Sequence, residues 1–563
     1  MSTEVPLTVD SALLPQEVRA CHALISQLLD ELRKRDARVA DLEHRMDLLL
    51  RRLYGRTSEK LDPAQLALFD KAPEEPVPEL PLTPSSPTSR PTGAATKSGH
   101  GRRQLPDRLR RVEKIHDLTP AEKESLGGAA NLVLIGREET EQLEWEPSSL
   151  YVIKHVQLTY ARRDAKAAPR STPSTDAAET AAAAVITAKK PQQPIPGGLP
   201  GPGLLAQVAT AKFVDHLPLH RQERQFTRHG LFLPRQTTCD WALAGAELLG
   251  PLYELAQQVV IASDVLHLDA TSVKIRDAQQ KLQRTGYFWP CVGDAAHPLV
   301  VFHYTPTHTR DGPHEILRDF RGCLQVDAHS VYEELFARRD LATGQPVIVE
   351  VGCWMHARRK FFEARTVDRP RAEAALAAIG ELYAVERQIA EQLAGAWHEL
   401  PRAKQCAQVA AVRQERSRPV IDRLFPWLET EAPQLVPKNP VRQAMDYALR
   451  QRAALSRYCD DGRLAIDNGL AERTIRGVAL GRRNWLFCGS ERGARAACVY
   501  FSLAASCRRH EIDPFAYLRD VFTRLPVLLA DAAGRPSPEQ LRLLLPDCWQ
   551  PSELLPNCTQ IVG

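Results

Sequence analysis

Two aspartates in predicted strands are the first residues that suggest chemistry. Asp269 lies in the middle of the apolar run 265–275 (VLHLDATSVKI), and Asp327 lies at the end of the run 322–329 (GCLQVDAH). A carboxylate in a buried strand is costly unless it is paired or binds a metal ion. For either aspartate alone, an edge strand or a turn is the simpler explanation. Together, on adjacent strands of one sheet, they could supply oxygen ligands to divalent cations.

A third acid would complete a two-metal site, and here the sequence is less selective. Glu472 lies early in the segment 464–493, where Asn468 could cap a helix through its side chain. Arg476 follows four residues later and could pair with Glu472, which would give this glutamate an ordinary structural role. Composition and spacing therefore do not select Glu472 over the other glutamates.

Basic and aromatic residues close to these acids are candidates for contacts with nucleic acid. The group that follows Glu472 is Arg473, Arg476, Arg482, Arg483 and Trp485. Such a mixture suits contact with a DNA backbone and stacking on a base. A second group after His356 is Arg358, Arg359 and Lys360. For both groups a solvated helix face is the alternative. His356 itself could assist phosphate positioning or cap a helix, whereas Cys353 is expected in the core.

A mixed α/β sheet must position these residues. Five apolar runs are the strand candidates: 265–275, 286–293, 298–305, 322–329 and 347–354. The first three are adjacent, and the others alternate with helical segments, which predicts a mixed sheet. Residues 365–460 are helical in pattern and mostly polar, which indicates an insertion or a helical subdomain.

A helix-turn-helix pattern precedes the predicted sheet. The segment 218–244 predicts two short helices around a turn at Gly230, the second of which begins near Pro234. Its first side chains, which could reach base edges in a major groove, are Arg235, Gln236, Thr237 and Thr238. Many helical hairpins share this pattern, so a DNA-binding role stays open.

The N-terminal region predicts a coiled coil. A heptad register places apolar residues at eight of nine a and d positions, namely Ile25, Leu28, Leu32, Arg35, Val39, Leu42, Met46, Leu49 and Leu53, with Arg35 as the exception. Self-association through residues 25–53 is favoured over packing on the chain's own domain. A basic run, 97–114, could contact a DNA backbone or be a solvated linker end.

Composition excludes several classes of protein. The chain has 563 residues, a net charge of +4 and 12 cysteines, no two of which are spaced CxxC. No apolar run approaches the roughly 18–20 residues needed to cross a bilayer. We therefore expect a cytoplasmic, multidomain protein with reduced cysteines and no membrane partner. With so small a net charge, any signal for nucleic-acid binding must be local.

Motifs along nearly the whole chain, in order, resemble the insertion-sequence 66 family of bacterial DDE transposases. The catalytic-region motifs are LHLDATSVKI, LQVDAHSVY, CWMHARRKF, DNGLAERTIRGVALGRRNWLFCGSERG and DPFAYLRDVFTRLP. Before them, RRLYGRTSEKLDPAQLALF and PIPGGLPGPGLLAQVATAKFVDHLPLHRQERQF resemble the family's N-terminal segment and the stretch that precedes its catalytic domain. Because so many motifs agree in order, the resemblance is specific.

The resemblance implies an RNase H-like catalytic core with Asp269, Asp327 and Glu472 as its acidic triad. These acids would be both the catalytic residues and the ligands of two Mg²⁺ ions, with Mn²⁺ as a substitute. The implied reaction is phosphodiester hydrolysis at the ends of the element, followed by strand transfer into target DNA. The implied partners are double-stranded DNA, further copies of the chain and small accessory proteins encoded beside it.

This organisation gives a set of expected domain boundaries. They are a coiled-coil helix over 1–70, a linker over 71–103, a small β module over 104–163, a low-complexity linker over 164–203, a helical DNA-binding region over 204–260, the catalytic core over 261–364 and 461–526, a helical insertion over 365–460 and a tail over 527–563. The long insertion would explain why the glutamate lies so far along the chain from the second aspartate.

Two departures from the family pattern bear on function. The usual first motif has a glutamate after the aspartate and a proline after the threonine, where this chain has Ala270 and Ser272. The family commonly has a cysteine-rich zinc module within 115–163, but this chain has no cysteine between Cys21 and Cys239. We therefore expect a metal-free β module and no zinc.

Three functions remain open from the sequence. The first is an active transposase, which the intact triad favours. The second is a catalytically inactive regulator that binds element ends, which Ala270 and the missing cysteines favour. The third is an RNase H-like nuclease that cuts DNA without joining strands.

Overall fold

The computed structural model describes most of the chain from the β module onward. The described residues are 22, 25–35, 38, 105, 109–125, 128–146, 149–162, 185–276, 283–531 and 536–552. They belong to two compact units. The first unit comprises 1–104, 360–376 and 431–445, and the second comprises 105–359, 377–430 and 446–563. None of the described helices is long and apolar enough to cross a bilayer.

A four-stranded sheet begins the second unit. Its strands are β1 (Arg111–His116), β2 (Leu132–Glu146), β3 (Ser149–Arg162) and β4 (Val185–Thr187), and the short helix α3 (Pro120–Ser125) follows β1. The sheet order is β1-β3-β2, with β1 parallel and β2 antiparallel to β3, and β4 also pairs with β3. β4 and the residues after it lie in the stretch that we expected to be a linker. The reason is backbone pairing, because Val185–Thr187 extends the edge of β3.

Four helices follow, in the region predicted to be helical. They are α4 (Pro202–Phe213), α5 (Leu219–Arg228), α6 (Arg235–Leu248) and α7 (Gly250–Ile261). The predicted turn is confirmed, since Gly230 has φ of 74° and Pro234 is the N-cap of α6. The predicted pattern of two short helices around a turn is therefore present in α5 and α6.

Glycines join the first sheet to α4. The Glu144 side chain, 5% exposed, accepts a hydrogen bond from Leu204 N at 2.8 Å, within the first turn of α4. A Cβ on Gly201 or Gly203 would come within 2.3 Å of a Glu144 carboxylate oxygen. The carboxylate thus accepts a hydrogen bond at the start of the helix, where backbone N–H groups have no partner within the helix. Any side chain larger than that of glycine at positions 201 and 203 would collide with this carboxylate.

The second sheet is mixed, as predicted, and it organises the rest of this unit. Its strands are β5 (Val265–Leu268), β6 (Thr271–Arg276), β7 (Gln283–Val292), β8 (Val300–Thr305), β9 (Gly322–Gln325) and β10 (Ile348–Val351). β5 and β6 follow one another along the same edge of β7, and both are antiparallel to it. The other edge of β7 pairs with β8. On the far side, β9 and β10 continue the sheet in parallel with β5.

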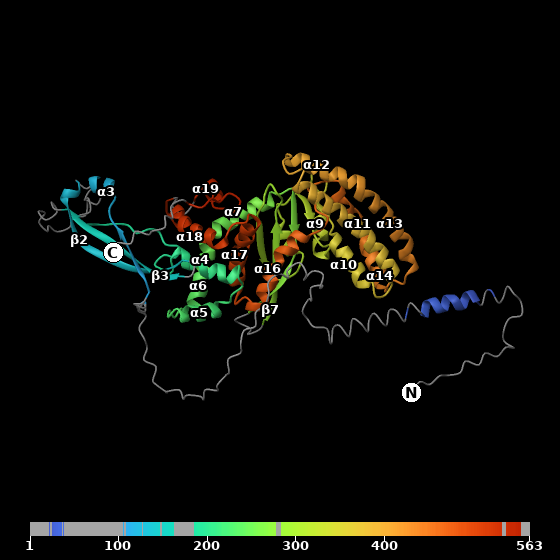
Figure 1. Ribbon diagram of the computed structural model, residues 1–563, viewed down its shortest axis with the longest axis horizontal. Helices are drawn as coiled ribbons and strands as arrows, with labels where there is room; N and C mark the ends of the chain where they lie inside the picture. The colour runs from blue at the N-terminus through green and yellow to red at the C-terminus, as the bar shows by residue number, and fades with distance from the viewer. Residues whose placement is uncertain are drawn as a thin grey trace, which may run out of the picture. The chain divides into compact units, whose positions relative to one another are not determined.

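Helices pack on this sheet and cover its open edge (Figure 1). α16 (Gly469–Trp485) contacts β7, and α17 (Glu491–Arg509) contacts β8. Two serines one turn apart on α17, Ser502 and Ser506, accept hydrogen bonds from the backbone N–H groups of Phe302 and Val300 at 2.8 and 2.9 Å. These bonds satisfy donors that an edge strand would otherwise leave unpaired.

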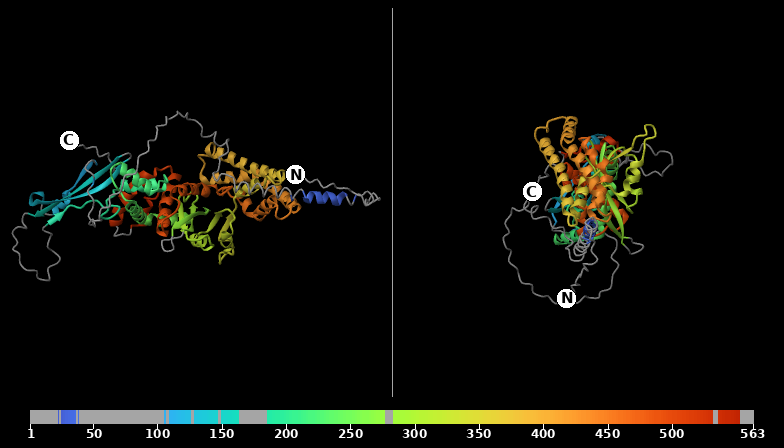
Figure 2. Two further views of the ribbon diagram at one scale, coloured as in Figure 1. Left: turned by 90° about the horizontal axis from the view of Figure 1, so that it is seen from below. Right: turned by 90° about the vertical axis from the view of Figure 1, so that its right-hand side faces the viewer.

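The remaining helices form the connections and the insertion. They are α8 (Asp311–Ile316), α9 (Glu333–Ala337), α10 (Trp354–Ala364), α11 (Arg369–Ala394), α12 (Arg402–Val412), α13 (Arg418–Glu431), α14 (Pro440–Arg450) and α15 (Arg452–Ser456). A π-helical turn, Arg413–Ser417, joins α12 to α13. The helices drawn in orange, α11 to α13, lie side by side in Figures 1 and 2, and ion pairs from Glu381 and Glu386 connect them.

The C-terminal segment is packed rather than a free tail. α18 (Pro514–Asp531) is followed by α19 (Pro538–Arg542), and Leu544 and Leu545 are buried. Trp549 donates its indole N–H to the buried Asp520 at 2.7 Å. The expectation of a tail from 527 is therefore corrected for 527–531 and 536–552, because their apolar side chains find partners in the core.

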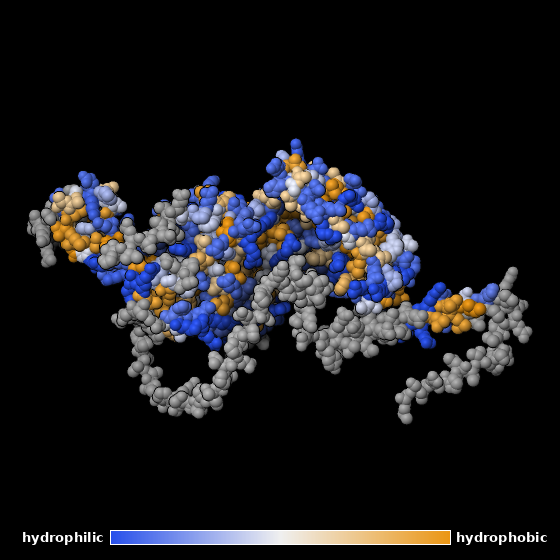
Figure 3. All heavy atoms as spheres, viewed as in Figure 1, coloured by the Kyte–Doolittle hydropathy of each residue, from blue (hydrophilic) through white to orange (hydrophobic). Residues whose placement is uncertain are grey.

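In the first unit, residues 25–35 are helical. Ile25, Leu28, Leu29 and Leu32 are each about half exposed, and orange atoms mark this helix in Figure 3. The rest of the predicted coiled coil and the linker 71–103 lie outside the described residues.

Candidate active site

Asp269 follows β5 directly, so the predicted strand 265–275 is in fact two strands with this aspartate at the break. Asp269 Oδ1 accepts a hydrogen bond from Ala270 N at 2.7 Å, which takes that N–H out of the strand ladder. Leu268 pairs with Cys291 and Thr271 with Phe288, so the same register places Asp269 opposite Pro290, which has no N–H to donate. The break turns the carboxylate into a strand-end ligand rather than a mid-strand residue.

Asp327 occupies the matching place on the neighbouring strand. β5 and β9 are parallel, and His267 is in register with Gln325. Asp269 and Asp327 each lie two residues beyond this pair, at the same edge of the sheet. Ala328 has φ of 61°, and His329 N donates to Asp327 Oδ1 at 3.2 Å. The expected pairing of two acids on adjacent strands is thus present.

Glu472 reaches the same edge from α16, and Asn468 fixes the start of that helix. Asn468 is fully buried, donates from Nδ2 to Leu268 O at 2.8 Å and accepts through Oδ1 from His267 Nδ1 at 3.1 Å. Asn468 is the N-cap residue of α16, as predicted, but its side chain bonds to β5 and not to its own helix. This crosslink holds the first turn of α16, with Glu472, beside the end of β5.

The electrostatics of the three acids are those of a crowded cluster. The pKa of Asp269 is raised to about 7, chiefly by burial and further by the neighbouring charges of Asp327 and Glu472, although the hydrogen bond from the Ala270 N–H acts against this. Burial also raises the pKa of Glu472, and the charge of Asp327 contributes in the same direction. Carboxylates that repel one another in a partly buried place favour either a proton or a bound cation.

The carboxylates therefore fit a divalent-metal site by their donor type and by their mutual repulsion. Glu472 Oε1 is, in addition, a buried oxygen without a hydrogen-bond partner among the described residues. Oxygen-only ligands with negative charge are the donors that Mg²⁺ and Mn²⁺ prefer.

His356 lies next to Glu472, which sequence analysis did not predict. Its Nδ1 lies 3.6 Å from Glu472 Oε1, and Arg476, the predicted ion-pair partner, is exposed instead. Cys353, His356 and Glu472 each offer one donor atom, and these atoms lie within 4.8 Å of one another. The CxxH spacing of the first two residues was the sole signal available in the sequence.

Three family models match the chain. The model described as "Transposase IS66 family" matches residues 197–496, which include all three acids. The chain belongs to the IS66 transposase family. The "IS66 C-terminal element" matches residues 502–546, and the model described as "Transposase C of IS166 homeodomain" matches residues 41–113. Together the matches run from the N-terminal region to the end of the packed core.

Curated relatives agree in length with this transposase. The uncharacterized protein y4hP of Sinorhizobium fredii is 30% identical over 510 residues, which is 86% of each chain. The uncharacterized protein y4qI of the same organism is 27% identical over 546 residues, or 95% of this chain and 94% of its own. The similarity thus extends over the whole architecture and not over the catalytic region alone.

The predicted DNA-contact residues of the transposase fall into different environments. At the start of α6, Arg235 and Gln236 are exposed and Thr237 is partly exposed. Thr238 is fully buried and donates to Arg235 O at 2.9 Å, so it cannot reach a base edge. Its prediction is corrected because the side chain faces the core of the helix pair.

The basic groups near the acids are mostly exposed. Six of them are exposed, namely Arg358, Arg359, Lys360, Arg473, Arg476 and Arg483. Arg482, in contrast, donates to the backbone and side-chain oxygens of Ser272 and ties α16 to β6. Trp485 packs over Gly481 and lines an apolar cavity of about 100 Å³ with Lys212 and Phe213. Arg482 and Trp485 therefore have structural contacts that the solvated-face alternative did not include.

Two further histidines lie beside Asp327. The rings of His308 and His329 are 4.8 Å apart, and His308 stacks on the buried Trp289 at 5.1 Å. Burial lowers the pKa of His308, and the charge of Asp327 acts against this. Single histidines in loops carry no sequence signal, so neither was a candidate.

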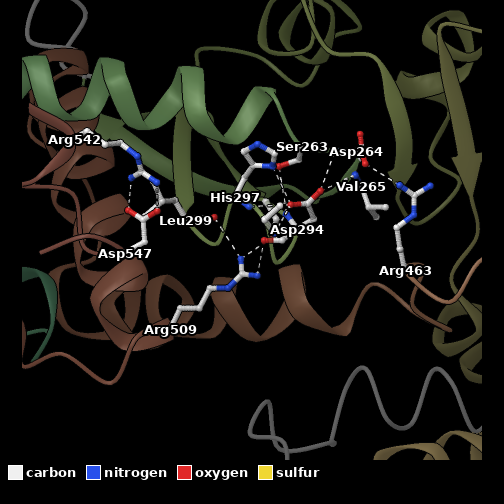
Figure 4. A network of polar contacts seen from close by, with 12 residues as sticks. Ser263, Asp264, Val265, Asp294, His297, Leu299, Arg463, Arg509, Arg542 and Asp547 are labelled. Atoms are coloured by element: carbon white, nitrogen blue, oxygen red, sulfur yellow. Dashed lines mark hydrogen bonds and ion pairs between the residues drawn. The ribbon is translucent and has the colours of Figure 1, made fainter. Parts of the chain in front are cut away.

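A polar network fixes β5 at the end opposite to the acids (Figure 4). Asp294 accepts hydrogen bonds from Asp264 N at 2.9 Å and from His297 Nδ1 at 3.0 Å, and Arg463 pairs with Asp264 at 2.8 Å. Arg509 donates to the carbonyls of the same turn. With Asn468 at one end and this network at the other, β5 is a fixed support for Asp269.

Proposed function

We propose that this member of the family is an active DDE transposase. Asp269, Asp327 and Glu472 would be its catalytic triad and would hold two Mg²⁺ ions, or Mn²⁺ in their place. The observation that carries the proposal is the common register of Asp269 and Asp327 at one sheet edge, with Glu472 held there by Asn468. When bound, the ions would activate the attacking oxygen and stabilise the leaving oxygen in an in-line displacement.

The chain's own residues would bind and orient the DNA strand for two displacements. In the first, a water oxygen bonds to the phosphorus at the element's end, and the bond to the 3′ oxygen breaks, which leaves a free 3′-hydroxyl. In the second, this hydroxyl attacks a phosphodiester of the target, whose own 3′ oxygen leaves. Basic residues such as Arg358, Arg473 and Arg483, which are exposed, would contact phosphates.

The sheet topology supports the proposal of an RNase H-like core. Three antiparallel strands, with β5 and β6 counted as one interrupted strand, are extended on the β5 side by the parallel strands β9 and β10. A mixed sheet is what the family resemblance leads us to expect of such a core. The helix-turn-helix over α5 and α6, with Arg235, Gln236 and Thr237, is proposed as the element-end binding region, in keeping with its exposed first turn.

The partners follow from the same proposal. We infer that double-stranded DNA is bound at element ends and at the target, that copies of the chain associate through residues 25–53, and that small accessory proteins take part. A cytoplasmic, DNA-associated location goes with these partners. Zinc is not expected in this role, because the proposed ligands are oxygen atoms.

The test is Mg²⁺-dependent cleavage and joining of DNA that carries the element's own ends. The variant is Asp327→Asn, and the matched control is Asp422→Asn, an exposed aspartate on α13. We expect cleavage and joining by wild type and by the control, and a loss of more than about 100-fold in the Asp327 variant. DNA binding without cleavage in Mg²⁺ and Mn²⁺, with accessory proteins supplied, would leave the end-binding regulator. Cleavage without joining would leave the nuclease.

A further inference from the structure

His356 lies in the first turn of α10, and strong contacts fix the start of that helix. Trp354, which is fully buried, donates its indole N–H to Leu455 O at 2.8 Å and its backbone N–H to Ile466 O at 3.1 Å. Both acceptors lie in the chain segment that leads into α16. The position of His356 relative to Glu472 is therefore set by backbone anchors and not by the pair itself.

The two facing atoms, one on His356 and one on Glu472, are both buried. His356 Nδ1 and Glu472 Oε1 lie 3.6 Å apart, and neither makes a hydrogen bond in the described part of the chain. A buried polar atom left unpaired costs free energy. The separation is slightly too long for a hydrogen bond, so a shift of about half an ångström would form one between Nδ1–H and the carboxylate.

Cys353, the third member of the cluster, already has a bonding role. Its Sγ accepts a hydrogen bond from Asn468 N at 3.2 Å, which joins the start of α10 to the start of α16. His356 is thus the residue of this cluster that remains free to bond Glu472.

We propose that His356 is a positioning residue that holds Oε1 of Glu472 through its Nδ1–H and leaves Oε2 for a cation shared with Asp269 and Asp327. The inference rests on the proposed function of Glu472. Metal-ligating carboxylates commonly accept such a bond from a neighbouring side chain, and removal of that neighbour typically costs 10–100-fold in metal affinity or activity.

The test measures Mn²⁺ binding to the full-length protein by electron paramagnetic resonance, without DNA. His356→Ala is compared with His356→Asn, whose amide N–H can take the place of Nδ1–H, and with His356→Gln, whose amide lies nearer the place of Nε2. His398→Ala, an exposed histidine in the insertion, is the control. We expect about 10–100-fold weaker Mn²⁺ binding for Ala, a smaller loss for Asn than for Gln, and no change for the control.

A second readout separates positioning from mere support of the fold. The metal concentration for half-maximal cleavage is expected to rise in His356→Ala, while the rate at saturating metal and the affinity for element-end DNA stay near wild type.

Equal Mn²⁺ affinity of His356→Ala and wild type would overturn the proposal. Zn²⁺ binding that is lost equally in Cys353→Ser and His356→Ala would also overturn it, in favour of a Cys/His/Glu metal site. Absence of cleavage by wild type would contradict the proposed function, whereas the Mn²⁺ comparison would still decide the role of His356.

Discussion

At the scale of single residues, the surroundings of Asp269 and Glu472 disfavour the ionised form of each carboxylate. Burial and two neighbouring carboxylates raise the pKa of Asp269 to about 7, so a proton competes with any cation for this oxygen. Such clusters are typical of functional sites, where affinity for a ligand is obtained at the expense of the free protein's stability.

Asp269→Asn is expected to separate these two effects. The amide removes one of three repelling charges, so the free energy of unfolding of the metal-free protein is expected to equal or exceed that of wild type, by up to about 1 kcal/mol. Cleavage of element-end DNA is expected to fall by more than about 100-fold. Chemical denaturation in chelator and a cleavage assay on the same preparation check the prediction, and a clear loss of stability would argue against a repelling cluster.

Some of the site residues could be predicted from the sequence pattern, and others could not. Asp269 and Asp327 could be found because an acid within an apolar run is unusual. Glu472 could not be selected from pattern, since a glutamate near the start of a helix is common, and the family resemblance supplied it. His356 was missed as a partner of Glu472, and Asn468 was assigned a capping bond it does not make, because both contacts cross more than 100 residues of chain.

At the scale of elements, a line of buried polar groups runs through the first sheet. Gln142 Nε2 donates to Pro200 O at 3.3 Å, so its Oε1 accepts from His155 Nε2 at 2.7 Å. His155 Nδ1 then accepts from His116 Nε2 at 2.9 Å. This chain of bonds requires a neutral His155, and burial lowers the pKa of His155 to about 4.

The first sheet is therefore expected to lose stability in mild acid. The unfolded chain binds a proton at His155 with a pKa near 6.5, whereas the folded sheet resists it down to about pH 4. Stability is fully present above pH 6.5 and falls as the pH drops toward 4, by up to about 3 kcal/mol. Amide hydrogen exchange of residues 132–162 at pH 7 and pH 5 measures this. His155→Gln, which cannot take up a proton, is expected to reduce the pH dependence, and an unchanged dependence would contradict the assignment.

A buried arginine ties the helical insertion to the segment before Glu472. Arg413 is 4% exposed, pairs with Glu386 through two nitrogens at 2.7 and 2.8 Å, and donates to the carbonyls of Tyr458 and Leu464. Its position in a π-helical turn allows it to reach these groups from the end of α12. The insertion therefore supports the chain that enters α16.

Arg413→Ala is expected to destabilise the protein by about 3–5 kcal/mol, because it leaves the partly buried Glu386 without its partner and removes the donor to the carbonyls of Tyr458 and Leu464. Arg423→Ala, which breaks the exposed pair with Glu381, is the matched control and is expected to cost less than about 1 kcal/mol. Thermal denaturation compares the two variants. Similar losses would mean that the insertion does not depend on the buried pair.

Local patterns predicted the elements well and their boundaries less well. The turn at Gly230 and the five strand regions follow from glycine, proline and apolar periodicity, and all are present. The break between β5 and β6 could not be predicted, because it depends on a side-chain bond from Asp269 to the backbone of Ala270. β4 was not predicted, because it lies in a low-complexity stretch. Its three residues are too few to show the alternation that identifies a strand.

At the scale of the whole molecule, the helix at residues 25–35 offers an apolar face for association. Ile25, Leu28 and Leu32 occupy a and d positions of the predicted heptads and are about half exposed. The substitution Leu28→Glu combined with Leu32→Glu is expected to reduce the oligomeric state measured by light scattering after gel filtration, because it places charges in the seam. Leu29→Glu, outside the a and d positions, is the control and is expected to have a smaller effect. Equal effects would contradict the predicted register.

Family membership describes the whole chain, and the fold of the second unit positions the proposed acids within it. The composition could exclude a disulfide-stapled or membrane-spanning protein, but it could not reveal a nucleic-acid enzyme at a net charge of +4. That conclusion needed motifs in a fixed order, since the relevant charges are local and the acids meet only in the folded sheet.

The most direct test of the central claim is cleavage of the protein backbone by hydroxyl radicals generated at bound Fe²⁺. If Asp269, Asp327 and Glu472 share a cation site, Fe²⁺ bound there with ascorbate and peroxide is expected to cut the full-length chain near all three residues, and excess Mg²⁺ is expected to suppress the cuts together. Cuts near only one of the three positions, or cuts confined to residues 353–356, would contradict the proposed triad.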